Sequence, residues 1–223
     1  MIIPISYPLN ADSPLYPGTP PIKINPEKSI AKGDSANTSV ISTSSHAGTH
    51  VDVPRHFCES GFSVRDVFQR VNSYSPVYCI DLPVTGEESI RPEDLDEKLA
   101  GKEDAIVLLI RTGTGELRDS DPRTYATTHP WVHPGIAPFL RSRCPHLRIV
   151  GIDTISISTP SHRQEGRESH RAFLCDEAPI LLLEDADLSL VTSNNKFTLI
   201  LFPWLIGDLD GVPVTAFLTI NPC

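Results

Sequence analysis

The sequence predicts a single α/β domain in which a mixed, largely buried β-sheet is flanked by helices. The chain has 223 residues, which is long enough for one large domain with a proper hydrophobic core. Two wholly apolar runs, A-I-V-L-L-I and I-L-L-L, are typical of strands covered on both faces. No internal repeat, low-complexity tract or long linker divides the chain, so we expect one domain over residues 1–223.

Seven runs rich in β-branched and aromatic residues are expected to be strands. They occupy residues 38–43, 77–82, 105–111, 148–153, 179–183, 197–201 and 212–220. The longest apolar stretch, residues 197–207, has about half the length of a membrane span and is interrupted by Pro203. We therefore predict that this stretch is a buried strand.

Three segments between the strands are expected to be helices. Residues 91–100 open with a proline and acidic residues, as first helical turns do, and residues 134–143 are amphipathic. Residues 63–71 form the third candidate. Residues 118–131 and 158–169 are polar and rich in turn residues, so we expect irregular loops there, of a length that is often functional.

Composition narrows the class of partner. The net charge of -9 and the pI near 5.3 disfavour a nucleic acid or an anionic membrane as partner and leave small neutral substrates open, so a small-molecule substrate is expected. The 21 prolines indicate many rigid turns. The N-terminal residues show no basic region followed by an apolar stretch, so no signal peptide is expected.

Five cysteines stand at positions 58, 79, 144, 175 and 223. Their odd number, wide scatter and lack of a C-x-x-C motif predict reduced thiols in a cytoplasmic protein. Cys58 lies two residues after His56 and could be a ligand or a nucleophile, but a small buried core residue is the preferred interpretation.

Residues 46–57, H-A-G-T-H-V-D-V-P-R-H-F, hold three of the eight histidines and an aspartate. Gly48 and Pro54 argue against a helix, and the metalloprotease pattern H-E-x-x-H is absent. In an extended segment His50 and Asp52 point to the same side. Imidazole and carboxylate groups gathered in one place form a metal-ligand set, and burying them together without a metal would leave polar groups unpaired.

Other motif-like features carry weaker signals. Local hydrogen bonding is the expected role of four histidines outside the cluster, His129, His133, His146 and His162. G-T-G at residues 113–115 lacks the further glycines and the helix of a nucleotide loop. D-L-D-G at residues 208–211 lacks the glutamate that completes a calcium loop, so a hairpin turn is predicted there.

The string from His46 to His56 resembles the H-x-G-T-H-x-D-x-P-x-H signature of the cyclase-like metal-dependent hydrolases, the family of bacterial kynurenine formamidase and isatin hydrolase. All fixed positions match. Further similar segments extend the resemblance over nearly the whole chain, at residues 7–9, 15–18, 33–37, 109–113, 149–154, 169–174, 180–184 and 207–214. The resemblance implies a swivelling β/β/α, cyclase-like fold and a homo-oligomer, expected to be a dimer.

The resemblance also implies a ligand set. It assigns His46, His50 and Asp52 to one metal, with Asp52 bridging to a second metal that is held also by His170 and Glu184. Zinc is the preferred metal for such a nitrogen-rich set, and manganese is the alternative.

The distant ligands have competitors. His162 lies eight residues before His170 in a polar segment, and only the S-H-R-A-F-L context favours His170. Asp185 and Glu177 compete with Glu184, which is preferred because it ends an apolar strand.

The same resemblance implies that His56 donates and accepts the proton in catalysis. Tyr16 stands where kynurenine formamidases place an aromatic residue that contacts the substrate, usually tryptophan. Thr19 stands where many members have aspartate. These two departures concern the identity of the substrate more than the chemistry.

The implied reaction is the hydrolysis of a small amide. A divalent metal with an open position makes water nucleophilic near neutral pH and polarises a carbonyl. The resemblance implies an arylformamidase, which converts N-formyl-L-kynurenine to L-kynurenine and formate. Hydrolysis of a lactam, lactone or other cyclic amide is the alternative. A non-catalytic, metal-stabilised binding module is a third hypothesis, although structural zinc sites usually have four protein ligands.

Overall fold

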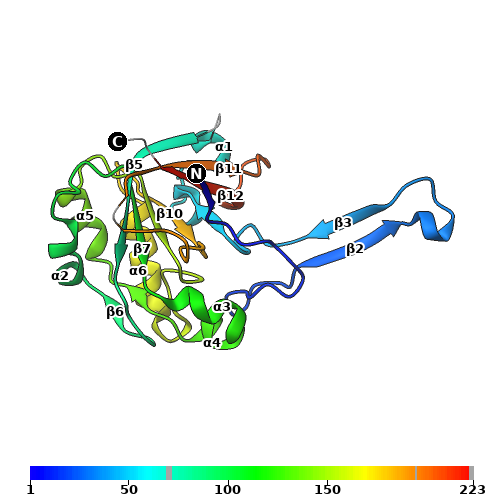
Figure 1. The fold of residues 1–223 in the computed structure, drawn as a ribbon, viewed down its shortest axis with the longest axis horizontal. Coiled ribbons are helices and arrows are strands. Elements are labelled where there is room, and N and C mark those ends of the chain that lie inside the picture. The colour runs from blue at the N-terminus through cyan, green and yellow to red at the C-terminus, as the bar shows by residue number, and fades with distance from the viewer. Residues whose placement is uncertain (69–71, 194, 221–223) are drawn as a thin grey trace.

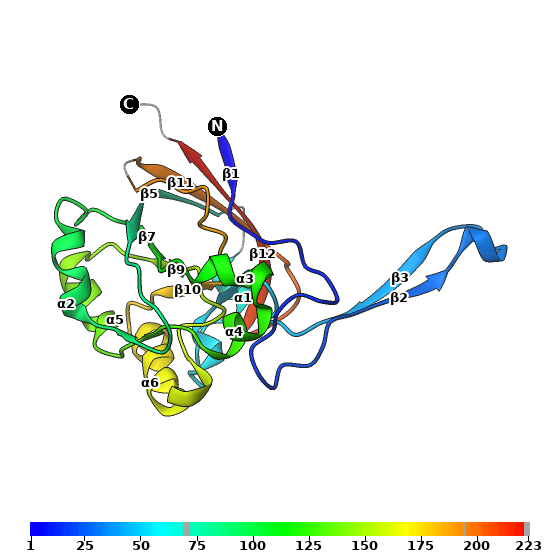
Figure 2. The ribbon, with the colours of Figure 1, turned by 60° about the horizontal axis from the view of Figure 1, so that its bottom comes forward.

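The computed structural model describes residues 1–68, 72–193 and 195–220, and its body is a closed mixed β-barrel with helices on the outside (Figure 1 and Figure 2). In spatial order the sheet consists of β1 (Ile2–Pro4), β12 (Gly211–Ile220), β11 (Phe197–Pro203), β5 (Asn72–Asp81), β7 (Val107–Arg111), β9 (Ile149–Ile152), β10 (Leu181–Glu184) and β4 (His50–Asp52). β4 pairs with both β10 and β12, and this double pairing closes the barrel.

The central strands are covered on both faces, as the apolar runs predicted. β5, β7, β9 and β10 run parallel, and the remaining pairs of the barrel are antiparallel. Along β7, Val107 and Leu109 belong to one core cluster with Val51 of β4, whereas Leu108 and Ile110 belong to a second cluster. The period-two alternation of an extended strand thus feeds two cores at once. The predicted mixed, largely buried sheet is confirmed.

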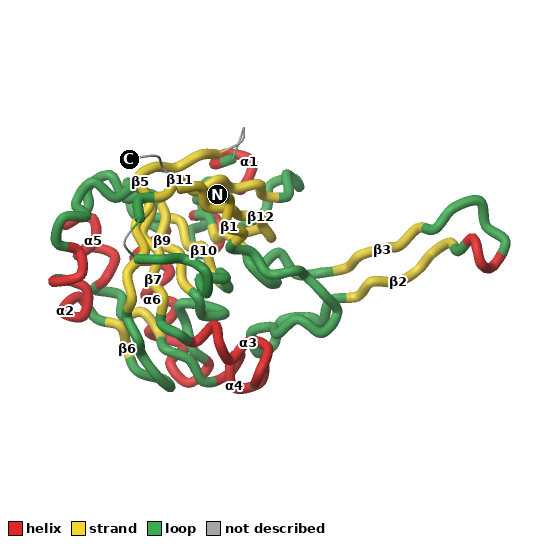
Figure 3. Tube along the Cα trace, in the orientation of Figure 1, coloured by secondary structure: helices red, strands yellow, loops and turns green. Residues whose placement is uncertain are grey.

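Helices and short 3-10 turns lie outside the barrel, and the turn at residues 30–32 lies far from it, at the tip of a projecting hairpin (Figure 3). The helices are α1 (Val64–Val67), α2 (Pro92–Leu95), α3 (Leu117–Ser120), α4 (Pro122–Thr127), α5 (Ile136–Arg143) and α6 (Arg163–Leu174). The 3-10 turns are η1 (Ile30–Lys32), η2 (Pro54–His56), η3 (Glu97–Leu99), η4 (Thr114–Glu116) and η5 (Pro160–His162). A small parallel pair, β6 (Ser89–Ile90) with β8 (Trp131–Val132), lies outside the barrel. The longest helix, α6, packs against β10 and α5 and so reaches the edge where β4 and β10 meet.

A two-stranded arm projects from the body (Figure 1). It is formed by the antiparallel pair β2 (Lys23–Lys28) and β3 (Thr38–Ser42), whose residues are all exposed. The strand predicted at residues 38–43 exists, but it belongs to this arm rather than to the barrel. We did not predict β2, because Pro26 and charged residues interrupt its run.

Two of the predictions for local structure are wrong. Residues 163–169, expected to be an irregular loop, begin α6. The inward positions of α6 include Gly166, Ser169 and His170, so the apolar period that would reveal a helix is missing. The run at 197–207 is a strand only to Pro203, and Trp204, Leu205 and Ile206 are exposed.

Other predictions are met in part. The helix expected at residues 63–71 is the short α1, and residues 69–71 lie outside the described residues. Residues 118–131, expected to be irregular, contain α4. D-L-D-G lies in the connection of the antiparallel β11–β12 hairpin. Within the described residues, no helix combines the length and apolarity needed to cross a membrane.

The prediction of reduced thiols is wrong for one pair of cysteines. Cys58 and Cys175, which are 117 positions apart in sequence, form a disulfide. The pairing arises because η2 and the end of α6 meet in space, which the spacing of the cysteines does not reveal. Cys79 and Cys144 are free and buried, and Cys223 lies outside the described residues.

Candidate metal centre

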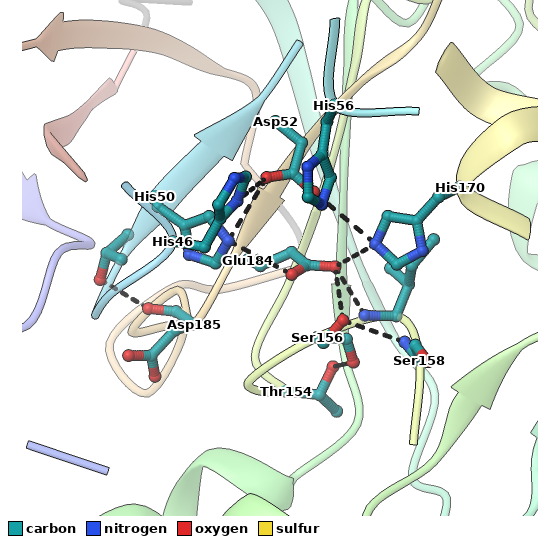
Figure 4. Close-up of polar contacts among 12 residues, drawn as sticks. His46, His50, Asp52, His56, Thr154, Ser156, Ser158, His170, Glu184 and Asp185 are labelled. Atoms are coloured by element: carbon teal, nitrogen blue, oxygen red, sulfur yellow. Dashed lines mark hydrogen bonds and ion pairs between the residues drawn. The ribbon is translucent and has the colours of Figure 1, made fainter. Parts of the chain in front are cut away.

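Two neighbouring strands bring three polar side chains to one face of the barrel (Figure 4). β4 pairs with β10 in a register that sets His50 opposite Glu184 and Asp52 opposite Leu182. Because side chains alternate along a strand, His50, Asp52 and Glu184 share one face, whereas Val51 enters the barrel core. All three polar side chains are almost completely buried.

Helix α6 adds His170 to the same cluster. Its Nε2 lies 3.4 Å from a Glu184 oxygen and 3.6 Å from Asp52 Oδ2. The Nε2 of His50 lies 3.4 Å from Asp52 Oδ1 and 3.4 Å from Glu184 Oε2. Gly166 allows this close approach of the helix, because a Cβ there would lie 2.0 Å from Ser158 Oγ.

Hydrogen bonds fix which nitrogen of each buried imidazole faces the carboxylates. His50 Nδ1 lies 2.8 Å from the Gly48 carbonyl oxygen, and His170 Nδ1 lies 2.7 Å from that of Gly166. A carbonyl can only accept, so each Nδ1 carries a proton and donates it. In the neutral imidazole the lone pair is then on Nε2, which points at the carboxylates.

This donor set fits a divalent cation. One ligand atom each from His50, Asp52 and Glu184 lie within 4.8 Å of one another. Asp52 Oδ2 is buried and has no hydrogen-bond partner among the described residues. Buried polar atoms are normally paired, so an unpaired carboxylate oxygen beside two Nε2 lone pairs is accounted for by a cation.

The charges of the cluster support the same interpretation. Burial would lower the pKa of His50, but Glu184 and Asp52 raise it, and the pKa of His170 is raised in the same way. Burial would raise the pKa of Glu184, yet the two imidazoles hold it well below its usual value. The carboxylates therefore stay ionised and require positive charge beside them, which either imidazole protons or a metal can supply.

His46 and His56 form the outer part of the cluster together with Asp210. His46 Nδ1 lies 2.8 Å from Asp52 Oδ1, and its Nε2 lies 2.8 Å from Asp210 Oδ2. Burial would lower the pKa of His46, but Asp52 and Asp210 raise it to about 10. His56 Nδ1 lies 3.0 Å from Asp210 Oδ2, and its ring stacks on His46 with 4.0 Å between centroids.

Sequence reasoning missed Asp210. It belongs to the D-L-D-G string, for which we predicted a turn and, within residues 207–214, a resemblance to the family, but no role at the site. The pairing of Gly211 with Asp52 brings that string to the cluster. A Cβ at Gly211 would lie 2.4 Å from His46 Cε1, so the glycine makes room for the imidazole. The signal available in the sequence was an acidic residue directly before a glycine and a strand.

A cavity of about 500 Å³ opens over the cluster. Its wall includes Tyr16, Phe57 and Ile155 as well as Thr19, so aromatic and apolar groups lie beside the polar centre. The Tyr16 hydroxyl lies 3.5 Å from Ser158 Oγ. The Phe57 ring stacks on His170, with 4.7 Å between centroids. The cavity thus offers flat apolar surfaces next to ionised groups.

The competing distant residues lie elsewhere. His162 stacks on Trp131 and faces Glu165, and Glu177 is exposed. Asp185 is buried, but its carboxylate binds the Arg118 guanidinium in a bidentate pair at 2.8 and 3.0 Å. His170 and Glu184 are therefore the candidates that the structure brings into the cluster.

Asp185 has a supporting role. It has a φ of 52°, which is unusual for a residue other than glycine, and the Tyr125 hydroxyl donates to it at 2.6 Å. Its backbone N–H donates to Thr154, and its carbonyl accepts from the Thr49 hydroxyl. These contacts fix the turn that directly follows Glu184.

Comparison with known proteins agrees with the fold and the motif. Residues 3–159 match the family described as "Putative cyclase". The kynurenine formamidase of Bacillus cereus is 33% identical over 216 residues, which cover 96% of this chain and 95% of that protein. Isatin hydrolase A from Labrenzia aggregata superimposes with a TM-score of 0.80 at 21% identity, covering 98% of this chain and 93% of that one. A protein described as a predicted metal-dependent hydrolase from Bacillus stearothermophilus gives a TM-score of 0.73 at 21% identity, with 98% and 97% covered. The cyclase-like resemblance and fold are confirmed.

Proposed function

The chain belongs to the putative cyclase family, and from this premise we propose that it is a metal-dependent amide hydrolase of the arylformamidase type. The observation that carries the proposal is the meeting of two buried imidazoles, two buried carboxylates and a second histidine pair at one cavity. A kynurenine formamidase that is similar over nearly its whole length supports the choice of substrate class.

Five residues are proposed as metal ligands. We assign His46, His50 and Asp52 to one cation, and Asp52, His170 and Glu184 to a second. Zinc is the preferred metal and manganese is the alternative. The unpaired Asp52 Oδ2 supports the bridging role. When bound, such a metal makes water nucleophilic near neutral pH and polarises the amide carbonyl.

His56 is proposed to move the proton. Its Nδ1 faces Asp210, which leaves Nε2 for exchange with a substrate in the cavity. As a water molecule adds to the formyl carbon, Nε2 of His56 takes a proton from that water. The same nitrogen returns a proton to the departing nitrogen while the carbon–nitrogen bond breaks, so a formamide and water give an amine and formate.

The cavity wall supports an aryl amide as substrate. Phe57 and Tyr16 present aromatic rings, and Ile155 adds an apolar surface at the same cavity. An aromatic ring packed there would shed water from both partners, which favours binding. We propose N-formyl-L-kynurenine as the leading candidate, with Tyr16 as a substrate contact. A cyclic amide such as isatin is the second candidate, which the same site chemistry would accept.

The protein is further proposed to act as a homodimer. An isolated two-stranded hairpin is at best marginally stable in water, yet the arm exposes Ile24 and Ile41 as direct cross-strand partners. A second exposed apolar group lies at Trp204, Leu205 and Ile206. Two copies related by a two-fold axis can cover both groups at once. The cytoplasmic location, and the absence of nucleic acid and membrane partners, stay predictions.

Formate release from N-formyl-L-kynurenine tests the function. Protein reconstituted separately with zinc and manganese is compared with His50→Ala, His56→Ala and the control His146→Ala, whose side chain is exposed. We expect His50→Ala to lose metal and activity together. His56→Ala should keep metal while turnover falls at least a hundredfold, on the order of a lost general acid–base group. His146→Ala should match the wild type.

The outcomes separate the hypotheses. Metal-dependent release that is absent from His50→Ala supports the arylformamidase. Hydrolysis of isatin alone would keep the metal-dependent hydrolase and replace its substrate. A metal-loaded wild type that hydrolyses neither compound would favour the non-catalytic binding module. An active and fully metallated His50→Ala protein would overturn the ligand assignment.

A further inference from the structure

Two arginines line the cavity and take no part in the metal cluster. Arg163 and Arg167 both belong to α6 and are the lysine or arginine residues among the described residues that line this cavity. They are four residues apart, so they lie on the same side of the helix, one turn from each other. Because α6 also carries His170, the same helix holds both arginines and a proposed metal ligand.

Neither guanidinium has a partner in the described part of the chain. No ion pair or side-chain hydrogen bond joins Arg163 or Arg167 to another described residue. The nearby carboxylates on α6 are occupied: Glu165 faces His162 at 3.8 Å, and Glu168 accepts from Gln164 at 2.9 Å. Both arginines are exposed, so their donors are open to a ligand that enters the cavity.

The charge of the molecule makes this pair significant. The protein has a net charge of -9, which on the whole disfavours the approach of an anion. The carboxylates of Asp52 and Glu184 at the base of the cavity lie beside His50 and His170 and belong to the proposed cation site. Two permanent positive charges on the wall give an approaching carboxylate a local attraction, and arginine binds carboxylates in a planar, two-donor geometry.

We propose that Arg163 and Arg167 form a subsite for a carboxylate at the end of the substrate remote from the scissile amide. The proposal rests on the proposed amide hydrolysis and selects, among aryl amides, those that carry an acidic side chain. It makes these arginines specificity-determining residues and distinguishes an amino-acid formamide from a neutral cyclic amide, which presents no group for them.

The spacing along the helix suits such a substrate. Arg167 and Arg163 precede His170 by three and seven residues, or about 4.5 and 10.5 Å along the helix axis. In N-formyl-L-kynurenine the carboxylate lies roughly 7 Å from the formyl carbon, as standard bond lengths give. A formyl group at the cluster therefore brings the carboxylate within the stretch of helix that the two arginines occupy.

The test compares a substrate that has the carboxylate with one that lacks it. N-formyl-L-kynurenine and N-(2-acetylphenyl)formamide share the aryl formamide, but only the first has the amino-acid group. Metallated wild type, Arg163→Ala, Arg167→Ala and the double variant are assayed with both. Arg171→Ala is the matched control, because Arg171 is an exposed arginine on the same helix that does not line the cavity.

We expect each single variant to raise the KM for N-formyl-L-kynurenine about twofold to fivefold, as for one charge-assisted contact at an exposed site. The kcat for this substrate should change little, and lysine at either position should restore part of the loss. Both constants for the neutral formamide should stay unchanged. Arg171→Ala should behave as the wild type with both compounds.

Equal loss on both substrates, or no loss on N-formyl-L-kynurenine, would overturn the subsite. If the wild type hydrolyses neither formamide, the proposed function fails, and calorimetric binding of L-kynurenine against 2-aminoacetophenone then decides the subsite alone. Tighter binding of L-kynurenine that is lost in the double variant supports the subsite. Equal binding of the two compounds overturns it.

Discussion

Asp210→Asn tests the residue that the motif did not reveal. The carboxylate accepts from His46 Nε2 at 2.8 Å and from His56 Nδ1 at 3.0 Å. These two contacts hold the pKa of Asp210 far below its ordinary value. Asparagine keeps the size of the side chain and removes the charge.

The magnitude follows from the two contacts. A hydrogen bond to a charged group stabilises by about 1 kcal/mol more than a neutral one, and the side chain of Asp210 is 38% exposed, which places the loss at the lower end of the range. A loss of about 1 kcal/mol in one contact corresponds to roughly fivefold in rate, and about 2 kcal/mol in both to roughly thirtyfold. We therefore expect kcat to fall between about fivefold and thirtyfold.

The assay is steady-state formate release with metal content measured on the same samples. Asp208→Asn is the matched control, because Asp208 is exposed and lies only two residues away. We expect Asp208→Asn to leave both readings unchanged. An Asp210→Asn enzyme with wild-type kcat would refute the positioning of His56 by this carboxylate. If metal content and activity fall in proportion, Asp210 acts by holding the proposed metal ligand His46 rather than by positioning His56.

Two further predictions concern the disulfide and the arm. The Cys58–Cys175 bond closes a loop of 117 positions, which should stabilise the fold by about 5 kcal/mol through the lost entropy of the unfolded chain. A Cys58→Ser/Cys175→Ser variant should therefore melt roughly 10–20 °C lower. The denatured, unreduced wild type should show three titratable thiols, and five would contradict the bond. If the protein is the proposed dimer, an Ile24→Ser/Ile41→Ser variant should sediment as a monomer while Ser39→Ala on the same arm stays dimeric. A wild type that is itself monomeric at micromolar concentration would contradict the proposed dimer.

An element could be predicted from the sequence where its buried positions carry apolar residues in the pattern typical of a strand or a helix. The apolar runs of β7 and β10 face two cores, so hydrophobicity alone located them. We did not predict α6 because several of its buried positions are not apolar: Ser169 and His170 lie where an amphipathic helix usually carries leucine or valine. β2 of the arm could not be predicted for a different reason. All its residues are exposed, so its sequence does not alternate between apolar and polar residues.

The residues of the candidate site also differ in whether the local sequence was enough to place them. His50 and Asp52 could be placed on one face from the sequence because both belong to one short strand, and strand geometry needs no tertiary information. The choice of Glu184 over Asp185 followed from the end of an apolar strand, and the structure adds the reason for it: Asp185 is committed to Arg118. Asp210 required the pairing of β12 with β4, a contact between residues more than 150 positions apart.

The barrel closure and the proposed chemistry depend on the same contact. β12 completes the barrel by pairing Gly211 with Asp52, and that pairing is what brings Asp210 beside His46 and His56. The contacts of Asp210 with His46 and His56, the residue proposed to move the proton, therefore form only when β12 pairs with β4. Four of the proposed ligands, His50, Asp52, His170 and Glu184, come from β4, β10 and α6, whereas His46 contacts both Gly211 and Asp210. A larger side chain at Gly211 should therefore displace His46 and lower both turnover and the occupancy of the cation assigned to His46, whereas a change at Glu184 should act on the cation assigned to His170.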